Sequence, residues 1–355
     1  PNYPEHTMKP THDAILLIGA SGFIGSALLA HLSRLLPETR LIVPSKRAWR
    51  HVSLSTMPSV HVVQADVHHE PSLQALIADS KLVINLAGVL HSDRATPWGK
   101  AFDAVHVKLP QRILKLLDKQ ALIHISALGC LPEDVDRAPS MYLRSKSQAE
   151  KMLLQSGHPV SLVRPSVVFG PKDKFLNVFA KLGAFVPVLP LAGAHARFAP
   201  VHVQDLCEVI CRLALHRLGR ESFIPKQVEG RKALSDWDRK ACLDTKASLI
   251  VEAFGPDRLT LAELFRFACE AAHGSSPWIV PLPYPLAYLQ ARMLEALPGP
   301  PLMSVDNLDS MRVDNLPSGK AQVLGVPVNT LATLGIKAKG LEAARDYLQS
   351  TPRGR

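Results

Sequence analysis

Three glycines near the start of the chain constrain its fold more than any other feature. They lie in Ala14-Ile-Leu-Leu-Ile-Gly19-Ala-Ser-Gly22-Phe-Ile-Gly25, where an apolar run ends at the first glycine and a helical pattern follows the third. This order predicts a strand, a tight turn and a helix whose first amides face an anion, because glycine lets the backbone approach a phosphate closely. We therefore expect a dinucleotide site that includes Gly19, Ser21, Gly22, Phe23, Ile24 and Gly25.

Strand-like and helical segments alternate through the first half of the chain. Strands are expected at 15–18, 41–43, 61–64, 82–86, 122–125 and 161–163, with helices at 26–36, 71–78, 101–117 and 140–155. Strands joined by helices of this length predict right-handed crossovers and a parallel sheet. The fold class we expect is α/β: a Rossmann doubly wound parallel sheet with a small C-terminal α/β lobe.

Changes in composition along the chain predict its division into parts. The expected parts are a flexible N-terminal extension (1–13), a Rossmann NAD(P)-binding domain (14–170, completed by about 201–218 and 249–252), a substrate or partner lobe (171–200 and 253–350) and a surface insertion (219–248). Within the lobe, an amphipathic helix is expected at 284–297. Its apolar face could pack on the core, line a pocket, bind a partner or touch a membrane.

Composition and charge exclude several classes of protein. The 355 residues are 47% hydrophobic and 20% charged, which is typical of a globular chain. No apolar run reaches the ~20 residues that span a bilayer, and we see no secretory signal. The five cysteines lack the spacing of a disulfide framework or a zinc site, so we expect a reduced, cytoplasmic protein without a metal site.

The net charge of +10 leaves the kind of partner open. An anionic cofactor or lipid headgroup would suit it, and so would a merely basic surface. The chain has no basic stripe interleaved with aromatic residues and no nucleic-acid-binding motif, so we expect no nucleic-acid partner.

The segment after the second expected strand bears on the choice of cofactor. An acidic residue about 20 residues beyond the glycines would bind the ribose 2′-hydroxyl of NAD. This chain has Ser45, Lys46 and Arg47 there, and a hydroxyl with two cations suits a 2′-phosphate. We expect NADP(H) to be preferred, with NAD(H) as the alternative if the two cations are only solvated loop charges.

The ends of the later strands supply the other expected cofactor contacts. Asp66 is placed to accept a hydrogen bond from the adenine amino group, with Val67 against the ring. Small residues after the fourth strand let a dinucleotide lie across the strand ends. The further expected contacts are Leu86, Ala87, Gly88, Pro165 and Val168.

A serine, a tyrosine and a lysine follow with spacing that suits proton transfer. Ser126 ends the fifth strand, and Tyr142 and Lys146 stand four residues apart on one helix face. A cationic lysine beside a phenol favours the phenolate, so the tyrosine can exchange protons nearer neutral pH. We expect these three residues to be catalytic, and Tyr142 and Lys146 to contact the cofactor as well.

Together these motifs resemble the short-chain dehydrogenase/reductase superfamily, in its extended or atypical branch. From about 14 to 348, apart from 219–247, the chain is similar to the nucleotide-binding accessory subunit family of respiratory complex I and its free-standing bacterial relatives. Segments such as Leu162-Val-Arg-Pro-Ser-Val-Val-Phe-Gly-Pro171 and Arg197-Phe-Ala-Pro-Val-His-Val-Gln-Asp205 carry this resemblance. It implies a Rossmann domain with a small lobe and tightly held NADP(H), which the eukaryotic members are thought to use structurally.

Three functions remain open from the sequence. The first is an NADP(H)-dependent oxidoreductase acting on a carbonyl or alcohol, including a quinone- or lipid-related one. The second is a non-catalytic accessory or assembly protein of a respiratory or quinone enzyme, stabilised by nucleotide, and the third is a sugar-nucleotide epimerase or dehydratase. Many enzymes of the superfamily carry an asparagine where this chain has His106, which could relay protons or simply pack. Peripheral contact at the inner face of the membrane, or with a respiratory complex, is the alternative to a purely cytoplasmic location.

Overall fold

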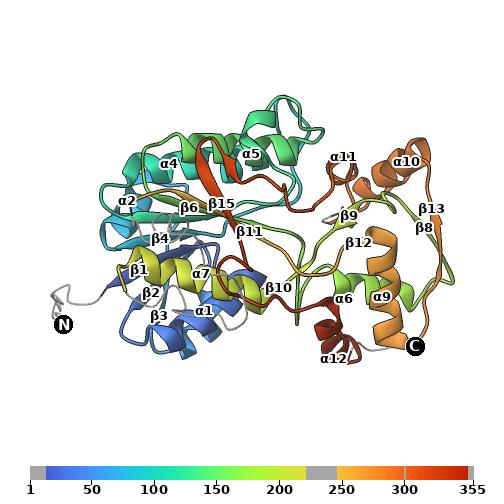
Figure 1. Ribbon diagram of the computed structural model, residues 1–355, viewed down its shortest axis with the longest axis horizontal. Coiled ribbons are helices and arrows are strands. Elements are labelled where there is room, and N and C mark those ends of the chain that lie inside the picture. Colours follow the sequence, from blue (N-terminus) through green and yellow to red (C-terminus); the bar gives the residue numbers. More distant parts are fainter. Residues whose placement is uncertain (1–12, 221–245, 300, 351–355) are drawn as a thin grey trace.

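A sheet of nine strands organises the molecule (Figure 1). The computed structural model describes residues 13–220, 246–299 and 301–350, so the expected extension and most of the expected insertion lie outside the described residues. In spatial order the strands are β14 (Gln322–Val323), β15 (Val326–Thr330), β11 (Leu249–Ala253), β6 (Val160–Pro165), β5 (Ala121–Ile125), β4 (Leu82–Asn85), β1 (Ala14–Ile18), β2 (Arg40–Ser45) and β3 (Val60–Gln64).

The strand order confirms the expected doubly wound α/β fold. Neighbouring strands are parallel from β3 to β15, and β14 alone runs antiparallel to its neighbour. The chain builds the sheet outward from β1 to β3 and then crosses to β4 on the other side of β1. This reversal opens a crevice at the carboxyl ends of β1 and β4, where sheets of this kind bind their ligands.

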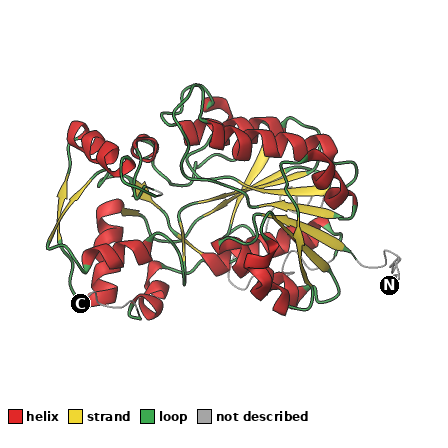
Figure 2. Ribbon diagram, turned by 180° about the vertical axis from the view of Figure 1, so that it is seen from behind, coloured by secondary structure: helices red, strands yellow, loops and turns green. Residues whose placement is uncertain are grey.

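Helices cover both faces of the sheet (Figures 1 and 2). The helices α1 (Phe23–Leu35) and α7 (Val203–Arg217) pack on one face, and α2 (Glu70–Ala78), α4 (Leu109–Leu116) and α5 (Met141–Leu154) pack on the other. Strand β1 has to be apolar throughout because both of its faces are covered. Ile15 and Leu17 belong to the core under α1 and α7, whereas Leu16 and Ile18 belong to the core under α2 and α4.

A smaller lobe lies at the end of the molecule opposite the N-terminus (Figure 1). Two short sheets, one of β8 with β13 and one of β9 with β12, hold it together with helices. Its elements are α6 (Leu176–Gly183), β8 (Val188–Leu191), β9 (Arg197–Phe198), β12 (Leu259–Thr260), α9 (Leu261–His273), β13 (Trp278–Pro281), α10 (Tyr284–Glu295), α11 (Val305–Ser310), η4 (Leu341–Ala344) and α12 (Arg345–Leu348). The pair β7 (Val168–Phe169) and β10 (Val201–His202) lies where the chain passes between the lobe and the sheet.

Two features differ from the expected elements. Residues 253–350 were assigned to the lobe, but β14 and β15 return to the main sheet, because β15 pairs with the otherwise open edge of β11. Residues 101–117 were expected to form one helix, but the structure has α3 (Lys100–Phe102), a π-helical turn, η2 (Asp103–Lys108), and then α4. Such π-turns occur often at functional sites. The rest of the expected division into parts stays a prediction.

Candidate functional site

The glycine turn between β1 and α1 has the backbone that a pyrophosphate needs. Gly19 has a φ of +82°, and a Cβ on it would lie 2.8 Å from the amide nitrogen of Ala87. A Cβ on Gly25 would lie 2.2 Å from Cα of Ala20, so only glycine lets α1 pack this closely. Helix α1 begins at an extended Gly22 that offers no side-chain cap. The first amides of α1 are therefore available to an anion, which fits a dinucleotide phosphate.

Exposed charges surround the ends of β2 and β3. The amine Nζ of Lys46 lies 2.9 Å from a carboxylate oxygen of Asp66, and the backbone amide of Arg47 donates to Oγ of Ser45 over 3.1 Å. Burial raises the pKa of Asp66, but the hydrogen bonds from Lys46 and from the amide of His68 outweigh it and lower that pKa overall. Lys46 is thus already paired, and because exposed ion pairs are weak, a phosphate could compete with Asp66 for it.

A buried amide–imidazole pair fixes the turn after β4. Oδ1 of Asn85 accepts the backbone amide of Ala87 over 3.1 Å, so its Nδ2 is left to donate to Nδ1 of His124, also over 3.1 Å. Burial, and then the nearby charge of Lys146, lower the pKa of His124 to about 3. The imidazole is therefore neutral, and it helps hold the Leu86–Gly88 turn in which cofactor contacts are expected.

His106 is held in place through both of its ring nitrogens. Nε2 accepts the backbone amide of Val89 over 3.1 Å, and Nδ1 lies 2.9 Å from Oγ of Ser145. The hydroxyl of Ser145 donates to the carbonyl oxygen of Tyr142, so it is the acceptor for Nδ1–H. Burial and the charges of Lys146 and His124 lower the pKa of His106 to about 2. This geometry favours a fixed, neutral histidine over a proton relay.

The three expected catalytic residues gather at the end of β5 and on α5. Lys146 is only 4% exposed and donates to the carbonyl oxygen of Ile125 over 3.2 Å. A Cβ placed on Gly88 would lie 3.7 Å from its Nζ, so the lysine borders the turn after β4. Tyr142 packs edge-on against the rings of His106 and Phe102, and Ser126 is buried at the strand end.

The pKa of Tyr142 shifts in the direction opposite to the one expected from the sequence. Burial raises it, and the negative charge of Asp306 raises it further. Burial lowers the pKa of Lys146 in turn. The sequence pattern placed a lysine beside the phenol but gave no measure of burial. Lys146 is buried and Tyr142 is partly buried, and burial disfavours the charged form of each.

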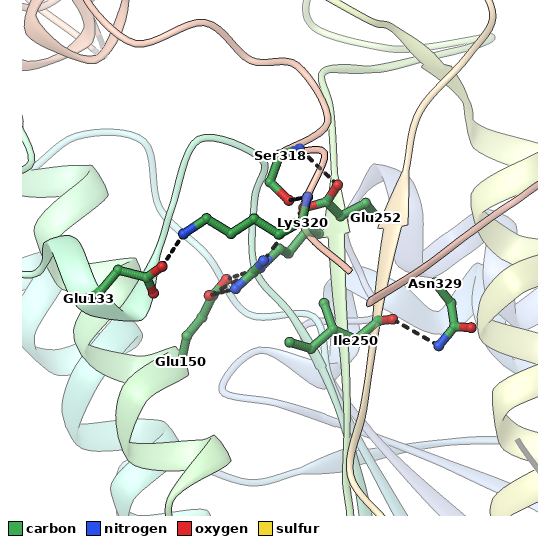
Figure 3. A network of polar contacts seen from close by, with 8 residues as sticks. Glu133, Glu150, Ile250, Glu252, Ser318, Lys320 and Asn329 are labelled. Carbon is green, nitrogen blue, oxygen red and sulfur yellow. Dashed lines mark hydrogen bonds and ion pairs between the residues drawn. The ribbon is translucent and has the colours of Figure 1, made fainter. Parts of the chain in front are cut away.

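A buried ion network lies behind the lysine and was missed by sequence reasoning. Nε of Arg164 on β6 donates to both carboxylate oxygens of Glu150 over 3.1 Å, and its Nη2 donates over 2.6 Å. Nη1 lies 3.5 Å from Glu252, which also accepts the amide of Ser318 (Figure 3). Burial raises the pKa of Glu150, while Arg164, Ser126 and Lys146 act to lower it. The only signal in the sequence was a charged residue inside each of two apolar strands.

The start of α5 receives a second set of contacts that no local pattern predicts. Oγ of Ser140 caps the helix by accepting the amide of Leu143 over 3.1 Å. The carboxylate of Asp306, from α11 in the lobe, accepts the amides of Met141 and Tyr142 over 2.6 and 3.1 Å. A residue far along the chain therefore completes the first turn of the helix that carries Tyr142 and Lys146.

The remaining expected contacts lie along the same edge of the sheet. Val67 follows β3 and packs on the core, Pro165 ends β6 and Val168 lies in β7. Ser21, Phe23 and Ile24 belong to the glycine turn and the start of α1. Every expected site residue thus lies at or just beyond the carboxyl end of a strand or on α5, and the role assigned to each stays a prediction. Within the described residues, no helix combines the length and apolar character needed to cross a bilayer.

Comparisons with known proteins identify relatives of the chain. The chain is 26% identical over 320 residues to the NADH dehydrogenase (ubiquinone) 1 alpha subcomplex subunit 9, mitochondrial, of Arabidopsis thaliana. The match covers 86% of this chain and 71% of that protein. It is 24% identical to the ceramide reductase of Caulobacter vibrioides over 196 residues, covering 54% of this chain and 57% of that protein. Against several other relatives the match spans little more than half of the relative's length.

The fold itself has counterparts among solved structures. The UDP-glucuronic acid 4-epimerase of Bacillus cereus, in complex with UDP-glucuronic acid and NAD, matches with a TM-score of 0.56 and 18% identity over 95% of this chain and 99% of that one. Residues 15–223 match the model of the NAD dependent epimerase/dehydratase family. These findings confirm the resemblance inferred from the sequence, and the chain belongs to the NAD dependent epimerase/dehydratase family, with its NAD(P)-binding Rossmann fold.

Proposed function

We propose that the chain is an NADP(H)-dependent oxidoreductase that acts on a carbonyl or an alcohol. The observation that carries this proposal is that Ser126, Tyr142 and Lys146 gather at the end of β5 and on α5. Lys146 borders the Gly88 turn, at the same sheet edge as the glycine turn. When bound, the dinucleotide supplies hydride chemistry. The chain supplies a site that excludes water and holds proton donors close to the reacting oxygen.

Each residue of the set has a separate role in this proposal. Lys146, bordering the Gly88 turn, holds the nicotinamide ribose, and Ser126 donates a hydrogen bond to the substrate oxygen. Because burial raises the pKa of Tyr142, its phenol is protonated at neutral pH. That state suits reduction, in which the tyrosine O–H gives its proton to the carbonyl oxygen.

The preference for the phosphorylated cofactor rests on the residues after β2. Ser45, Lys46 and Arg47 present a hydroxyl and two cations at the strand end where an NAD-binding chain would place a carboxylate. Arg47 can bind a phosphate through two parallel hydrogen bonds, and Lys46 can leave its exposed pair with Asp66 to do so.

Replacing the tyrosine tests the proposed reaction. Tyr142→Phe removes the proton donor and keeps the ring, so we expect turnover to fall by about 10²- to 10⁴-fold while NADPH affinity stays near normal. NADPH oxidation would be followed with a panel of aldehydes, ketones and quinones. Tyr284→Phe, on exposed α10, is the matched control and should keep full activity. An active Tyr142→Phe protein would rule out the assigned role.

A nucleotide-stabilised accessory protein is the second candidate, favoured by an apolar surface on the lobe. We call this surface the apolar rim. It consists of large exposed side chains on β8, β13 and α10 and in the segments next to them: Phe185, Val188, Trp278, Val280, Leu286, Leu289, Met293, Leu297 and Leu302. Exposed apolar groups that cluster in this way are typical of interaction sites. A partner in a respiratory or quinone complex, or the surface of a membrane, would cover them.

The apolar rim also suits an apolar substrate better than a sugar nucleotide.

Two measurements separate the accessory role from the enzymatic one. NADPH that copurifies with the chain, with no oxidation by any carbonyl or quinone tested, would favour the accessory role. Leu289→Glu with Met293→Glu should then abolish cosedimentation with membranes that contain the respiratory complex. Val52→Glu, at an exposed apolar position outside the lobe, is the control. Cosedimentation that survives the double change would exclude the apolar rim as the contact.

A further inference from the structure

A helix of the lobe completes the start of α5, and this joint has a consequence for the site. Asp306 is only 9% exposed, and its two carboxylate oxygens each accept one backbone amide, from Met141 and Tyr142. A helix leaves its first amides without partners inside the helix. Ser140 satisfies the amide of Leu143, and Asp306 satisfies the two amides that precede it.

The contact is too specific to be simple packing between the two parts of the molecule. A carboxylate at a helix N-terminus is stabilised by the helix dipole, and hydrogen bonds to a charged acceptor are stronger than those between neutral groups. The hydroxyl of Ser310, one turn beyond Asp306, donates to Oγ of Ser140 over 2.8 Å. Both ends of α11 therefore bind the residues that begin α5.

The same helix also reaches the loop that follows β4. Nδ2 of Asn307 donates to the carbonyl oxygen of Leu90 over 3.3 Å. Glu295, at the end of α10, accepts the amide of Val305 and pairs with Arg94 of that loop over 3.2 Å. The position of α11 is thus set against both segments that border Lys146.

We propose that Asp306 is a positioning residue, which fixes the first turn of α5 so that Tyr142 and Lys146 face the Gly88 turn. The inference rests on the proposed roles of Tyr142 and Lys146 toward the nicotinamide half of the cofactor. Asp306 acts on that half alone, because the glycine turn and the residues after β2 are held by other contacts. Loss of the Asp306 carboxylate should therefore weaken binding of the whole dinucleotide and leave unchanged the binding of a fragment that carries only the adenosine half.

The test compares NADPH with adenosine 2′,5′-bisphosphate, which lacks the nicotinamide ribose. For Asp306→Asn, which keeps the size of the side chain, and for Asp306→Ala we expect NADPH to bind at least about tenfold more weakly. Binding of the bisphosphate should stay unchanged, and this shows that each variant is folded. Asp309→Asn, on the same helix but facing Tyr288 and Arg312, is the matched control and should bind both ligands normally.

Lys146→Met separates the failure of this inference from the failure of the proposed function. If each of the two single variants, Lys146→Met and Asp306→Asn, loses affinity for NADPH but not for the bisphosphate, the positioning role is supported. If only Lys146→Met loses affinity for NADPH selectively, the positioning role is overturned and the proposed function stays intact. Normal NADPH binding by Lys146→Met overturns the proposed role of the lysine itself. Equal weakening of both ligands in Asp306→Asn would mean that Asp306 only stabilises the fold, which also contradicts the inference.

Discussion

The two ends of the candidate site lie on one edge of the same sheet but are built in opposite ways. At the β2–β3 end, the side chain of Lys46 is 62% exposed and its partner Asp66 is partly exposed. At the β4–β5 end, Lys146, His106, His124 and Ser126 are all buried; Lys146 and His106 bond to the backbone, and His124 bonds to the side chain of Asn85. One end offers exposed charges to a ligand, and the other holds its groups in buried positions.

This difference in burial determines how a substitution at each end affects ligand binding and folding stability. Exposed charges contribute little to folding, so the residues after β2 can change cofactor preference without endangering the protein. Buried charges are expensive to leave without a partner, so the β4–β5 end can change only together with the groups that support it. We expect substitutions at the first end to alter binding alone and those at the second to alter stability as well as binding.

Breaking the buried network should have the largest effect. Arg164→Met removes the partner of Glu150 and Glu252, and an unpaired buried charge costs about 3–5 kcal/mol of the free energy of unfolding. Lys320→Met is the control, because its pair with Glu133 is part-exposed and worth less than about 1 kcal/mol. Urea unfolding measures both, and equal losses would show that burial does not distinguish the two pairs.

Removing the cations after β2 should have an intermediate effect, and on binding only. The double variant Lys46→Ala, Arg47→Ala should bind NADPH about 30-fold more weakly, a loss of roughly 2 kcal/mol of binding free energy. The reason is that two charge-assisted contacts to the 2′-phosphate are lost. NADH affinity and the free energy of unfolding should stay the same. Fluorescence titration with each cofactor measures this affinity. Lys81→Ala is the control, because Lys81 directly precedes β4, at the amino ends of the strands and away from the candidate site. Equal weakening of NADPH and NADH would disprove the 2′-phosphate assignment.

Near neutral pH the buried histidines have the smallest effect on stability, which grows as the pH falls, and its sign follows from their depressed pKa values. The pKa is about 2 for His106 and about 3 for His124, below the usual 6.5, so the unfolded state takes up protons first as the pH falls. Stability is therefore fully present above pH 6.5 and is lost below it, by about 1.4 kcal/mol per pH unit for each histidine.

Single substitutions would assign this loss to the two residues. His106→Asn and His124→Asn should each reduce the slope of unfolding free energy against pH, by an amount that rises to about 1.4 kcal/mol per unit as the pH falls to 5. His69→Asn, whose side chain lies at the surface beside Ser72, is the control. An unchanged slope in all three variants would mean that the imidazoles are protonated in the folded protein.

Local signals carried most of what could be predicted from the sequence. The glycine spacing, the alternation of strands and helices and the order of Ser126, Tyr142 and Lys146 all lie in short segments, and the doubly wound parallel sheet followed from general rules of topology. The contacts of Asp306 with α5, the return of β15 to β11 and the pairing of Arg164 with Glu150 join segments that are distant in sequence. A single sequence provides no pattern for such contacts.

The shift of the tyrosine pKa was missed for a different reason. The spacing of Tyr142 and Lys146 showed that they share a helix face, but the direction of the shift depends on how much water the surrounding packing removes. Phe102 and His106 cover the ring, and both come from the segment that was expected to be a regular helix and forms a π-turn instead.

The return of β15 to the main sheet affects how this chain tolerates shortening. Between β11 and β15 the chain leaves the sheet, builds much of the lobe and comes back. A stop introduced before β14 therefore removes both β14 and β15 from the sheet as well as part of the lobe. The bared edge of β11 would present free amides and carbonyls to other chains. Truncation products should thus accumulate as aggregates, and a minimal nucleotide-binding fragment would have to keep β15, for example by closing the excursion with a short linker.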